Sequence, residues 1–355
     1  MTPKKPSISH AIKALSGLSL ALALAFAGCA APLRFTRAID PLSVMSADAD
    51  LYLRLSGRAA RDLAPVLLKP AQARSLSVIL DRTDTIALAF FGSRPGRAAM
   101  TDSGLQAFAK TPIPNNSSSL AGLSFEAVLM GEFPAGQISF GLSTSRGWKR
   151  ASSGFVNEGD GLGVSIPGRD VVLTASDSAG AGPEAALSRL VANLEEAILA
   201  TRPSPLPARL EPFAAAEGGR ELVLWAPDPF ARLLPDFLGG DSILPLKGVL
   251  LTASRAGTTG RDGAATPTDN KAALGEEELF EATLVFLMDG ERSARIFKPA
   301  AGLAWYAIAK TLFPELPALS RGVSFSTDGD ALVTGGIRIP LSGLVAVAAK
   351  YARSD

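Results

Sequence analysis

Histidine and cysteine are almost missing from this sequence. Its 355 residues include one histidine, His10, and one cysteine, Cys29. Beyond residue 29 there is therefore no imidazole or thiol for Ser-His-Asp or Cys-His catalysis, for a histidine base, or for the usual zinc and haem sites. A single cysteine also cannot form an intramolecular disulfide. We therefore expect a protein that is not an enzyme and that has no cofactor and no metal.

Sequence motifs of nucleophiles and phosphate-binding loops are also missing. The sequence contains no G-x-S-x-G, S-x-x-K, Walker A or H-E-x-x-H pattern. Gly159, Gly161 and Gly163 look superficially like a nucleotide-binding loop, but their spacing fails G-x-G-x-x-G and no helix is expected after them. The triplets 158–160 (Glu-Gly-Asp) and 328–330 (Asp-Gly-Asp) lack the further oxygen ligands of a calcium loop. Both triplets are predicted to be hairpin turns.

Basic charge is not in excess. The first 28 residues contain three of the 35 basic residues and no acidic one, which leaves 32 basic against 34 acidic residues. The sequence shows no basic patch or stripe, so we expect no nucleic-acid partner. With 47% hydrophobic and 19% charged residues, the chain is predicted to be globular and long enough for two domains.

The N-terminus has the three parts of a secretory signal. Lys4, Lys5 and Lys13 form a basic flank, and no charge occurs from Ala14 to Ala27. This uncharged stretch of 14 residues is shorter than the roughly 20 needed to span a bilayer, and it ends in small residues. Residues 1–28 are therefore predicted to be a signal peptide, in preference to a transmembrane anchor.

The end of this signal resembles the lipobox of bacterial lipoproteins. Phe26 takes the aliphatic position, and Ala27, Gly28 and Cys29 follow. Phenylalanine departs from the strict pattern and is similar to the relaxed lipobox of spirochaete-type lipoproteins. The resemblance implies that Cys29 is the acylated N-terminus of an exported, membrane-anchored protein, on the periplasmic or outer-membrane face. The alternative is ordinary cleavage after 25–27 (Ala-Phe-Ala), which would leave a free thiol.

Proline and glycine divide the rest of the chain. Residues 29–47 are expected to be a tether and residues 48–200 a first α+β domain. Residues 201–219, with prolines at 203, 205, 207 and 212, are expected to be a linker before a second domain, 220–355. The fold class is therefore predicted to be α+β, with two tandem, duplicated domains, each a mostly antiparallel sheet with helices on one face.

Hydrophobic periodicity supplies the expected elements. Strands are predicted at 50–55, 85–91, 125–130, 155–156, 162–166, 170–174, 221–225, 247–252 and 280–287, and around the turn at 328–330. Helices are predicted at 58–68, 71–81, 134–146, 185–199, 228–238, 300–312 and 339–352. The helix 185–199 has the clearest stripe, formed by Leu187, Leu190, Val191, Leu194 and Ile198, with Pro183 in its first turn.

The two halves repeat the order of these elements. Each half runs strand, proline-interrupted helix, strand, long polar loop, a strand beginning Phe-Glu-Ala at 125 or 280, and then a tryptophan, Trp148 or Trp305. This shared order predicts a duplication. Glu126 and Glu281 fall at equivalent positions, where a solvent-facing or edge residue is favoured over paired carboxylates. The two tryptophans are expected in cores rather than lining a groove.

The favoured function is a non-enzymatic, lipid-anchored envelope lipoprotein that interacts with another envelope protein. The alternative is a binding protein that holds a small or apolar ligand in a groove between the two domains. A hydrolase would need a Ser–Lys pair or two carboxylates in one pocket.

Overall fold

The computed structural model describes residues 39–67, 79–91, 124–176, 182–215, 220–229, 245–256, 279–312 and 323–342. The predicted signal peptide and Cys29 lie outside these ranges. So do the predicted helix 71–81, except for its last three residues, and nearly all of the predicted helix 228–238.

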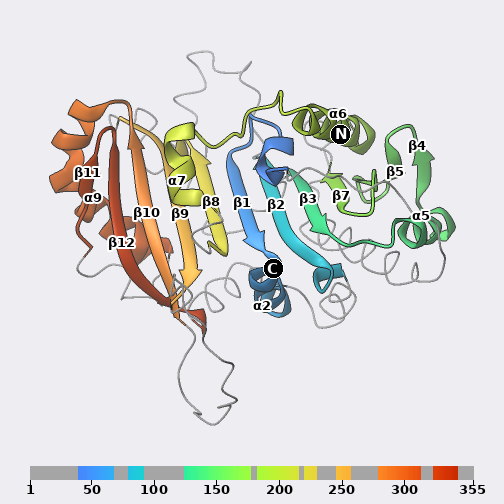
Figure 1. Ribbon diagram of the computed structural model, residues 1–355, viewed down its shortest axis with the longest axis horizontal. Coiled ribbons are helices and arrows are strands. Elements are labelled where there is room, and N and C mark those ends of the chain that lie inside the picture. Colours follow the sequence, from blue (N-terminus) through green and yellow to red (C-terminus); the bar gives the residue numbers. More distant parts are fainter. Residues whose placement is uncertain are drawn as a thin grey trace, which may run out of the picture.

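A single antiparallel sheet of twelve strands organises the molecule (Figure 1). The strand order is β11-β12-β10-β9-β8-β1-β2-β3-β7-β6-β5-β4. The strands of the first half are β1 (Leu51–Ser56), β2 (Thr83–Phe91), β3 (Ser124–Gly131), β4 (Lys149–Ala151), β5 (Gly154–Asn157), β6 (Leu162–Ser165) and β7 (Val171–Ser176). Those of the second half are β8 (Leu222–Pro227), β9 (Leu246–Arg255), β10 (Leu279–Met288), β11 (Ser326–Asp328) and β12 (Ala331–Pro340).

The two halves meet through a pair of hydrogen-bonded strands. β1 pairs with β8 in antiparallel register, with Tyr52 opposite Trp225 and Arg54 opposite Val223. One buried cluster includes Tyr52 from the first half and Trp225 and Leu250 from the second. The halves therefore share one sheet and one core. The groove predicted between two separate domains is replaced by paired strands along this seam.

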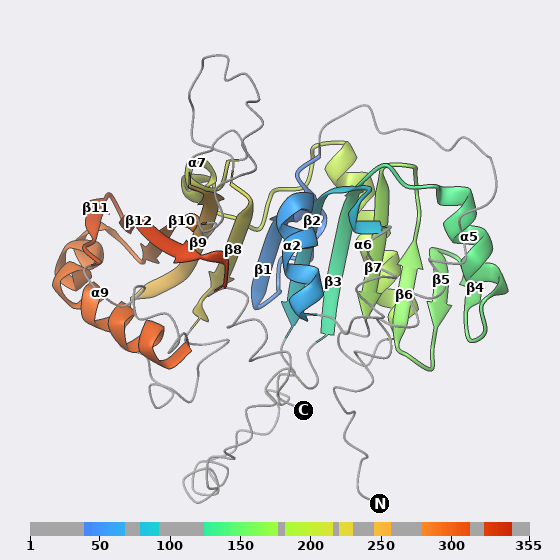
Figure 2. The same ribbon diagram turned by 90° about the horizontal axis from the view of Figure 1, so that it is seen from below.

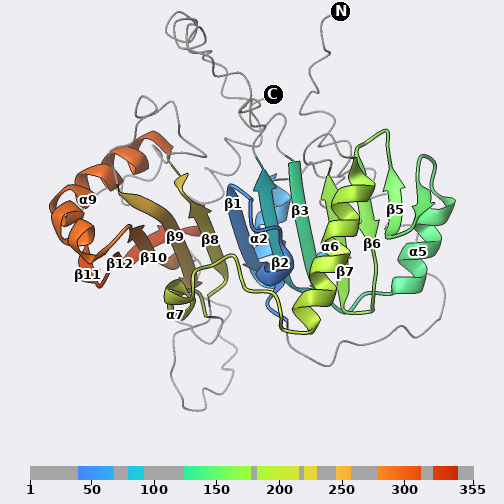
Figure 3. The same ribbon diagram turned by 90° about the horizontal axis from the view of Figure 1, so that it is seen from above.

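Helices lie on both faces of the sheet, where each domain was expected to have them on one face (Figures 2 and 3). One face is covered by η1 (Pro41–Val44), α6 (Pro183–Ile198), η3 (Ala208–Leu210) and α7 (Glu211–Ala214). The other face is covered by α2 (Gly57–Leu67), α5 (Ala135–Thr144) and α9 (Glu291–Leu312). Because alternate residues of a strand point to opposite faces, nearly every strand contributes side chains to both layers.

The α+β class and the mostly antiparallel sheet are confirmed. The predicted hairpins form at β5–β6 and β11–β12. Helix α6 begins with Pro183 at its first turn and buries Leu187, Leu190 and Leu194, as the apolar stripe predicted. One boundary is corrected, because helix α9 begins at Glu291, not at residue 300, and continues through Pro299. β12 ends at Pro340, and the two described residues that follow, 341 and 342, are helical, where a helix was predicted after Pro340.

The last part of the predicted tether belongs to the core. Residues 41–46 are all buried, with Leu42, Val44 and Met45 at 2%, 0% and 1% exposure. Burying an aliphatic or methionine side chain contributes about 1.5–3 kcal/mol relative to leaving it in water. Its polar residues and Pro41 are typical of a spacer, but burial of Leu42, Val44 and Met45 stabilises its packing against the sheet.

The predicted proline-rich linker also packs on the sheet. Within 201–215, Leu206, Leu210 and Ala214 are buried in the same cluster as Leu42 and Trp225. The prolines are compatible with the two short helices of this segment. η3 begins directly after Pro207, and Pro212 lies in the first turn of α7. This segment therefore covers the seam between the halves and does not separate them.

The duplication stays a prediction. The first three strands of each half, β1-β2-β3 and β8-β9-β10, occur in the same order on either side of the seam. The two Phe-Glu-Ala strands are β3 and β10, third from the seam on each side. Beyond them the halves differ, since four strands follow β3 and two follow β10.

Candidate functional site

A buried carboxylate on β3 is the centre of a polar cluster that joins three segments of the chain. Glu126 is fully buried, although its sequence pattern favoured a solvent-facing or edge position. Glu126 and Val128 alternate toward the layer that contains η1 and α6, while Phe125 and Leu129 pack with α5 on the opposite face. The carboxylate therefore points into the interior layer.

The carboxylate binds the chain segment that precedes β1. The backbone N–H of Ser46 donates to Oε2 of Glu126 at 2.9 Å, and the Ser46 hydroxyl donates to Oε1 at 2.7 Å. Nη2 of Arg189, on α6, lies 3.5 Å from Oε1. The Arg189 side chain is 48% exposed, whereas the Glu126 side chain is fully buried. The guanidinium therefore approaches the carboxylate from the solvent side.

We call residues Asp40–Asp50 the N-terminal strap. Four of its backbone carbonyls are held by side chains from elsewhere in the chain: Asn193 of α6 donates to Val44 at 3.0 Å, and the Tyr52 hydroxyl of β1 donates to Ser46 at 2.7 Å. Arg202 donates from Nε to Ser43 at 2.8 Å and from Nη2 to Met45 at 3.0 Å. Four consecutive carbonyls, from the end of η1 onward, are therefore satisfied by side chains.

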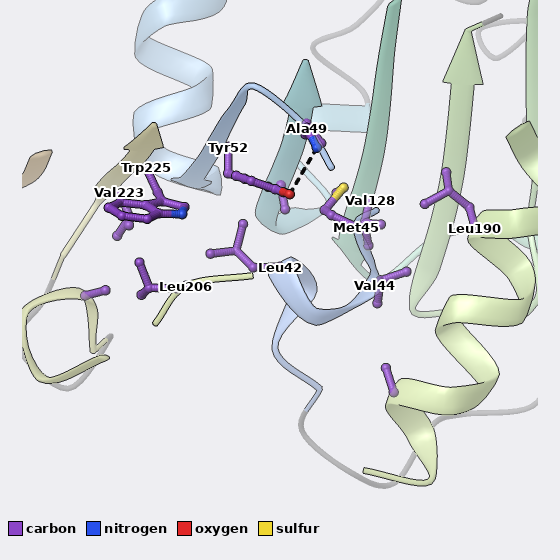
Figure 4. Packing of buried hydrophobic residues seen from close by; sticks show 14 of the residues in the cluster. Leu42, Val44, Met45, Ala49, Tyr52, Val128, Leu190, Leu206, Val223 and Trp225 are labelled. Carbon is purple, nitrogen blue, oxygen red and sulfur yellow. Dashed lines mark hydrogen bonds between the residues drawn. The ribbon is translucent and has the colours of Figure 1, made fainter. Parts of the chain in front are cut away.

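Apolar side chains seat the same segment against both halves. Figure 4 shows Leu42 beside Tyr52 and near Trp225 and Leu206, with Val44 and Met45 toward Val128 and Leu190. The Tyr52 hydroxyl also accepts from the Ala49 N–H at 3.2 Å, which closes the strap just before β1 begins. The strap is thus fixed by apolar burial and by hydrogen bonds together.

The environment of Glu126 favours its protonated form. Burial raises the pKa of Glu126 above its ordinary value of 4.5, and the nearby negative charge of Asp48 raises it further. The two hydrogen bonds from Ser46 and the positive charge of Arg189 act in the opposite direction and lower the pKa. Burial is the largest of these effects, since desolvation penalises the charged form.

The Glu126 cluster has the geometry of a structural lock more than of a catalytic site. A general acid or base must reach its substrate directly or through one water. Glu126 has no exposed surface, and the cavity of about 310 Å³ at the start of α5 is lined by other residues: Arg82, Gly131, Glu132, Phe133, Pro134, Arg169 and Asp170. Among the described residues, no group of three or more acidic, histidine or cysteine side chains is arranged to hold a metal.

A second charged cluster joins the halves on the other face of the sheet. Arg255 of β9 is only 5% exposed and donates from Nε to Glu221 at 2.9 Å. It also forms an ion pair with Asp62 of α2, and its guanidinium lies 5.4 Å from the centroid of the Phe280 ring. One buried cation thus holds a carboxylate from each half.

The residues singled out in the sequence do not converge. Glu126 on β3 and Glu281 on β10 are separated by β2, β1, β8 and β9, so they are not paired carboxylates. Trp305 of α9 is buried in a core, as expected, while Trp148 is half-buried against the edge of a different cluster. Cys29 lies outside the described residues.

The residues of the two polar clusters gave little signal in the sequence. Ser46 of the strap, Asn193 and Arg202 that bind the strap, and Arg255 on the other face belong to no motif, and each partner is distant in the chain. Arg202 stood in a segment expected to be linker, and Ser46 in a segment expected to be tether.

None of the helices in the described ranges is long and apolar enough to cross a bilayer. The sequence matches no known protein-family model and no curated protein.

Solved structures of TP0453 show the same fold. Its crystal form III has a TM-score of 0.52 and 18% sequence identity, over 88% of this chain and 99% of that one. Crystal forms I and IV each have a TM-score of 0.50 and 18% identity, over 89% of this chain and 100% and 98% of theirs. The likeness extends over nearly the whole of both chains and concerns the fold alone.

Proposed function

We propose that this protein is an exported lipoprotein, acylated at Cys29, whose folded part is a non-enzymatic module that interacts with another protein of the cell envelope. The proposal combines the signal-like N-terminus with a folded part that offers no accessible constellation of catalytic groups among the described residues. The charge balance and the missing motifs point in the same direction.

The observation that carries the proposal is the position of the strap. Cys29 and Asp40 are eleven positions apart, a reach of at most about 40 Å for an extended chain. The strap that follows is buried between the sheet and α6 and is hydrogen-bonded at four consecutive carbonyls. A lipid at Cys29 would therefore hold the folded body within about 40 Å of the membrane, through a segment that packs into the core.

Exposed apolar side chains support an interaction role. Ile296 and Leu303 of α9 are 69% and 73% exposed and lie two helical turns apart, on the side of the helix away from the sheet. Tyr306 is also exposed on the same helix. Large apolar side chains grouped on one exposed face are typical of surfaces that bind partners.

The anchor is tested by the variant Cys29→Ala in the organism or in an export-competent host. Metabolic labelling with a fatty acid and intact mass of the mature protein distinguish three outcomes. Acylation at Cys29 in the parent protein, lost in the variant together with membrane retention, supports the proposal. A mature chain that begins at Gly28 with a free thiol establishes the rival cleavage after Ala27. Unchanged membrane retention in Cys29→Ala contradicts the anchor.

The interaction is tested by crosslinking in intact envelopes. Leu303→Glu should reduce crosslinking to the partner if α9 forms the contact, and Phe140→Glu, which changes an exposed apolar residue on α5, serves as a matched control. Loss of crosslinking with Phe140→Glu but not with Leu303→Glu would move the contact to α5. No specific crosslinked partner with the parent protein would contradict an interaction role.

A further inference from the structure

Glu126 joins the strap to the sheet through a fully buried carboxylate, whereas the ion pair between Asp40 of the strap and Arg54 of β1 is longer, at 3.9 Å, and involves a 40% exposed carboxylate. From Pro41 to Ala49 the strap is a 3-10 turn followed by chain outside the strands, so its hold depends on specific side chains and not on a strand ladder. Of those side chains, the carboxylate of Glu126 accepts both the backbone N–H and the hydroxyl of one residue, Ser46.

We propose that the strap and Glu126 form a pH-sensitive lock, in which the strap is held most firmly when Glu126 is protonated and opens more readily when Glu126 is ionised. The inference does not depend on acylation of Cys29. It concerns the equilibrium between the bound and the released strap, the segment that would connect the folded body to the membrane.

The geometry couples the proton to the strap. With the strap in place, Glu126 has no exposed surface, and its carboxylate contacts Ser46 of the strap and Arg189 of α6. If the strap leaves, the carboxylate loses its contact with Ser46 and is hydrated. The closed state therefore penalises the charged form of Glu126 much more than the open state does.

Few charged groups face this carboxylate. Arg189 of α6 approaches from the solvent edge, and Asp48 lies on the strap itself. The two strands beside β3 place Ala89 and Ala175 opposite Glu126, so neither adds a charge there. A protonated carboxyl keeps one oxygen to accept from the Ser46 N–H and can donate to the Ser46 hydroxyl, so protonation preserves the contact.

The sign follows from linkage. Because burial raises the pKa of Glu126 in the closed state, the closed state binds the proton more tightly than the open state. The strap should be most firmly held below the ordinary value of 4.5, loosen as the pH rises through the raised pKa, and become insensitive to pH above it. Between the two pKa values the opening equilibrium changes up to tenfold per pH unit.

Hydrogen exchange of the full chain measures this opening directly. The informative amides are those of Met45, Ser46 and Asp50, which donate within or from the strap. Protection factors, corrected for the intrinsic pH dependence of exchange, should fall with rising pH in the parent protein. In Glu126→Gln they should stay constant. Glu281→Gln changes a half-buried glutamate in the same Phe-Glu-Ala context and should retain the parental dependence.

Two surface variants keep the proposal testable if Glu126→Gln fails to fold. Asp48→Asn removes a negative charge and should move the transition to lower pH, while Arg189→Gln removes a positive charge and should move it to higher pH. Protection factors independent of pH in the parent protein would overturn the lock. So would transitions that stay in place in both surface variants.

Discussion

Arg255 and Asp62 form an ion pair across the two halves of the chain, on the face of the sheet opposite the strap. Arg255 belongs to β9 and Asp62 to α2, and Glu221, just before β8, completes the cluster. Three sets of contacts therefore join the two halves: the strap on one face of the sheet, the hydrogen bonds between β1 and β8, and the ion pairs of Arg255 on the other face.

Replacing Arg255 with alanine should be among the most destabilising single changes in the protein. The Glu221 side chain is 12% exposed, so the variant would leave a mostly buried carboxylate without its cation. Removing one partner of a buried pair costs about 3–5 kcal/mol. Urea denaturation should show this loss in the free energy of unfolding.

Two further variants test whether the loss of stability in Arg255→Ala depends on the burial of its ion pairs. Asp62→Asn should cost less, about 1 kcal/mol, because that side chain is 34% exposed. Arg295→Ala removes an exposed ion pair with Glu291 on α9 and should change stability by less than about 0.5 kcal/mol. A similar loss for Arg255→Ala and Arg295→Ala would contradict the structural role given to the buried cluster.

Gly248 of β9 is required by the ring of Trp225. A Cβ placed on Gly248 would overlap the Trp225 ring atoms, and Trp225 is 3% exposed, so the ring has little room to move. Gly248→Ala should therefore cost about 1–3 kcal/mol through overpacking. Thermal unfolding should show a lower Tm.

Gly290 supplies the control for this change. A Cβ there would meet no atom within 4 Å, so Gly290→Ala should be neutral or slightly stabilising. The double variant Gly248→Ala with Trp225→Phe should recover part of the loss, because the smaller ring vacates the space. An unchanged Tm in Gly248→Ala would show that the β8–β9 contact is looser than described.

Local patterns predicted most of the strands and the best helix, because period and turn chemistry act over a few residues. The stripe of α6 and the Gly-containing hairpins are examples. The same patterns could not predict that β1 pairs with β8, since an edge strand and a central strand of this length look alike until their neighbours are known. The sequence therefore predicts two separate domains, whereas the structure shows that both halves belong to one sheet.

The candidate site was harder to predict for a related reason. A polar residue on a strand usually faces water, so Glu126 was assigned to the surface, and only the return of a distant segment over β3 encloses it. That segment, Asp40–Asp50, has three apolar residues that alone form no periodic pattern. Its buried position depends on hydrogen bonds from Asn193 and Arg202, some 150 residues away.

Arg202, which follows α6, should contribute strongly to holding the strap in place. Its guanidinium donates to the carbonyls of Ser43 and Met45, and hydrogen bonds from a charged donor contribute about 1.5–3 kcal/mol each. Arg202→Ala should leave both carbonyls without these donors and expose the strap to limited proteolysis at rates at least tenfold higher. Glu196→Gln, which changes only the exposed partner of Arg202 at 3.3 Å, should leave the rate nearly unchanged. Cleavage of both variants at the parental rate would mean that apolar burial of Leu42, Val44 and Met45 holds the strap without help from Arg202.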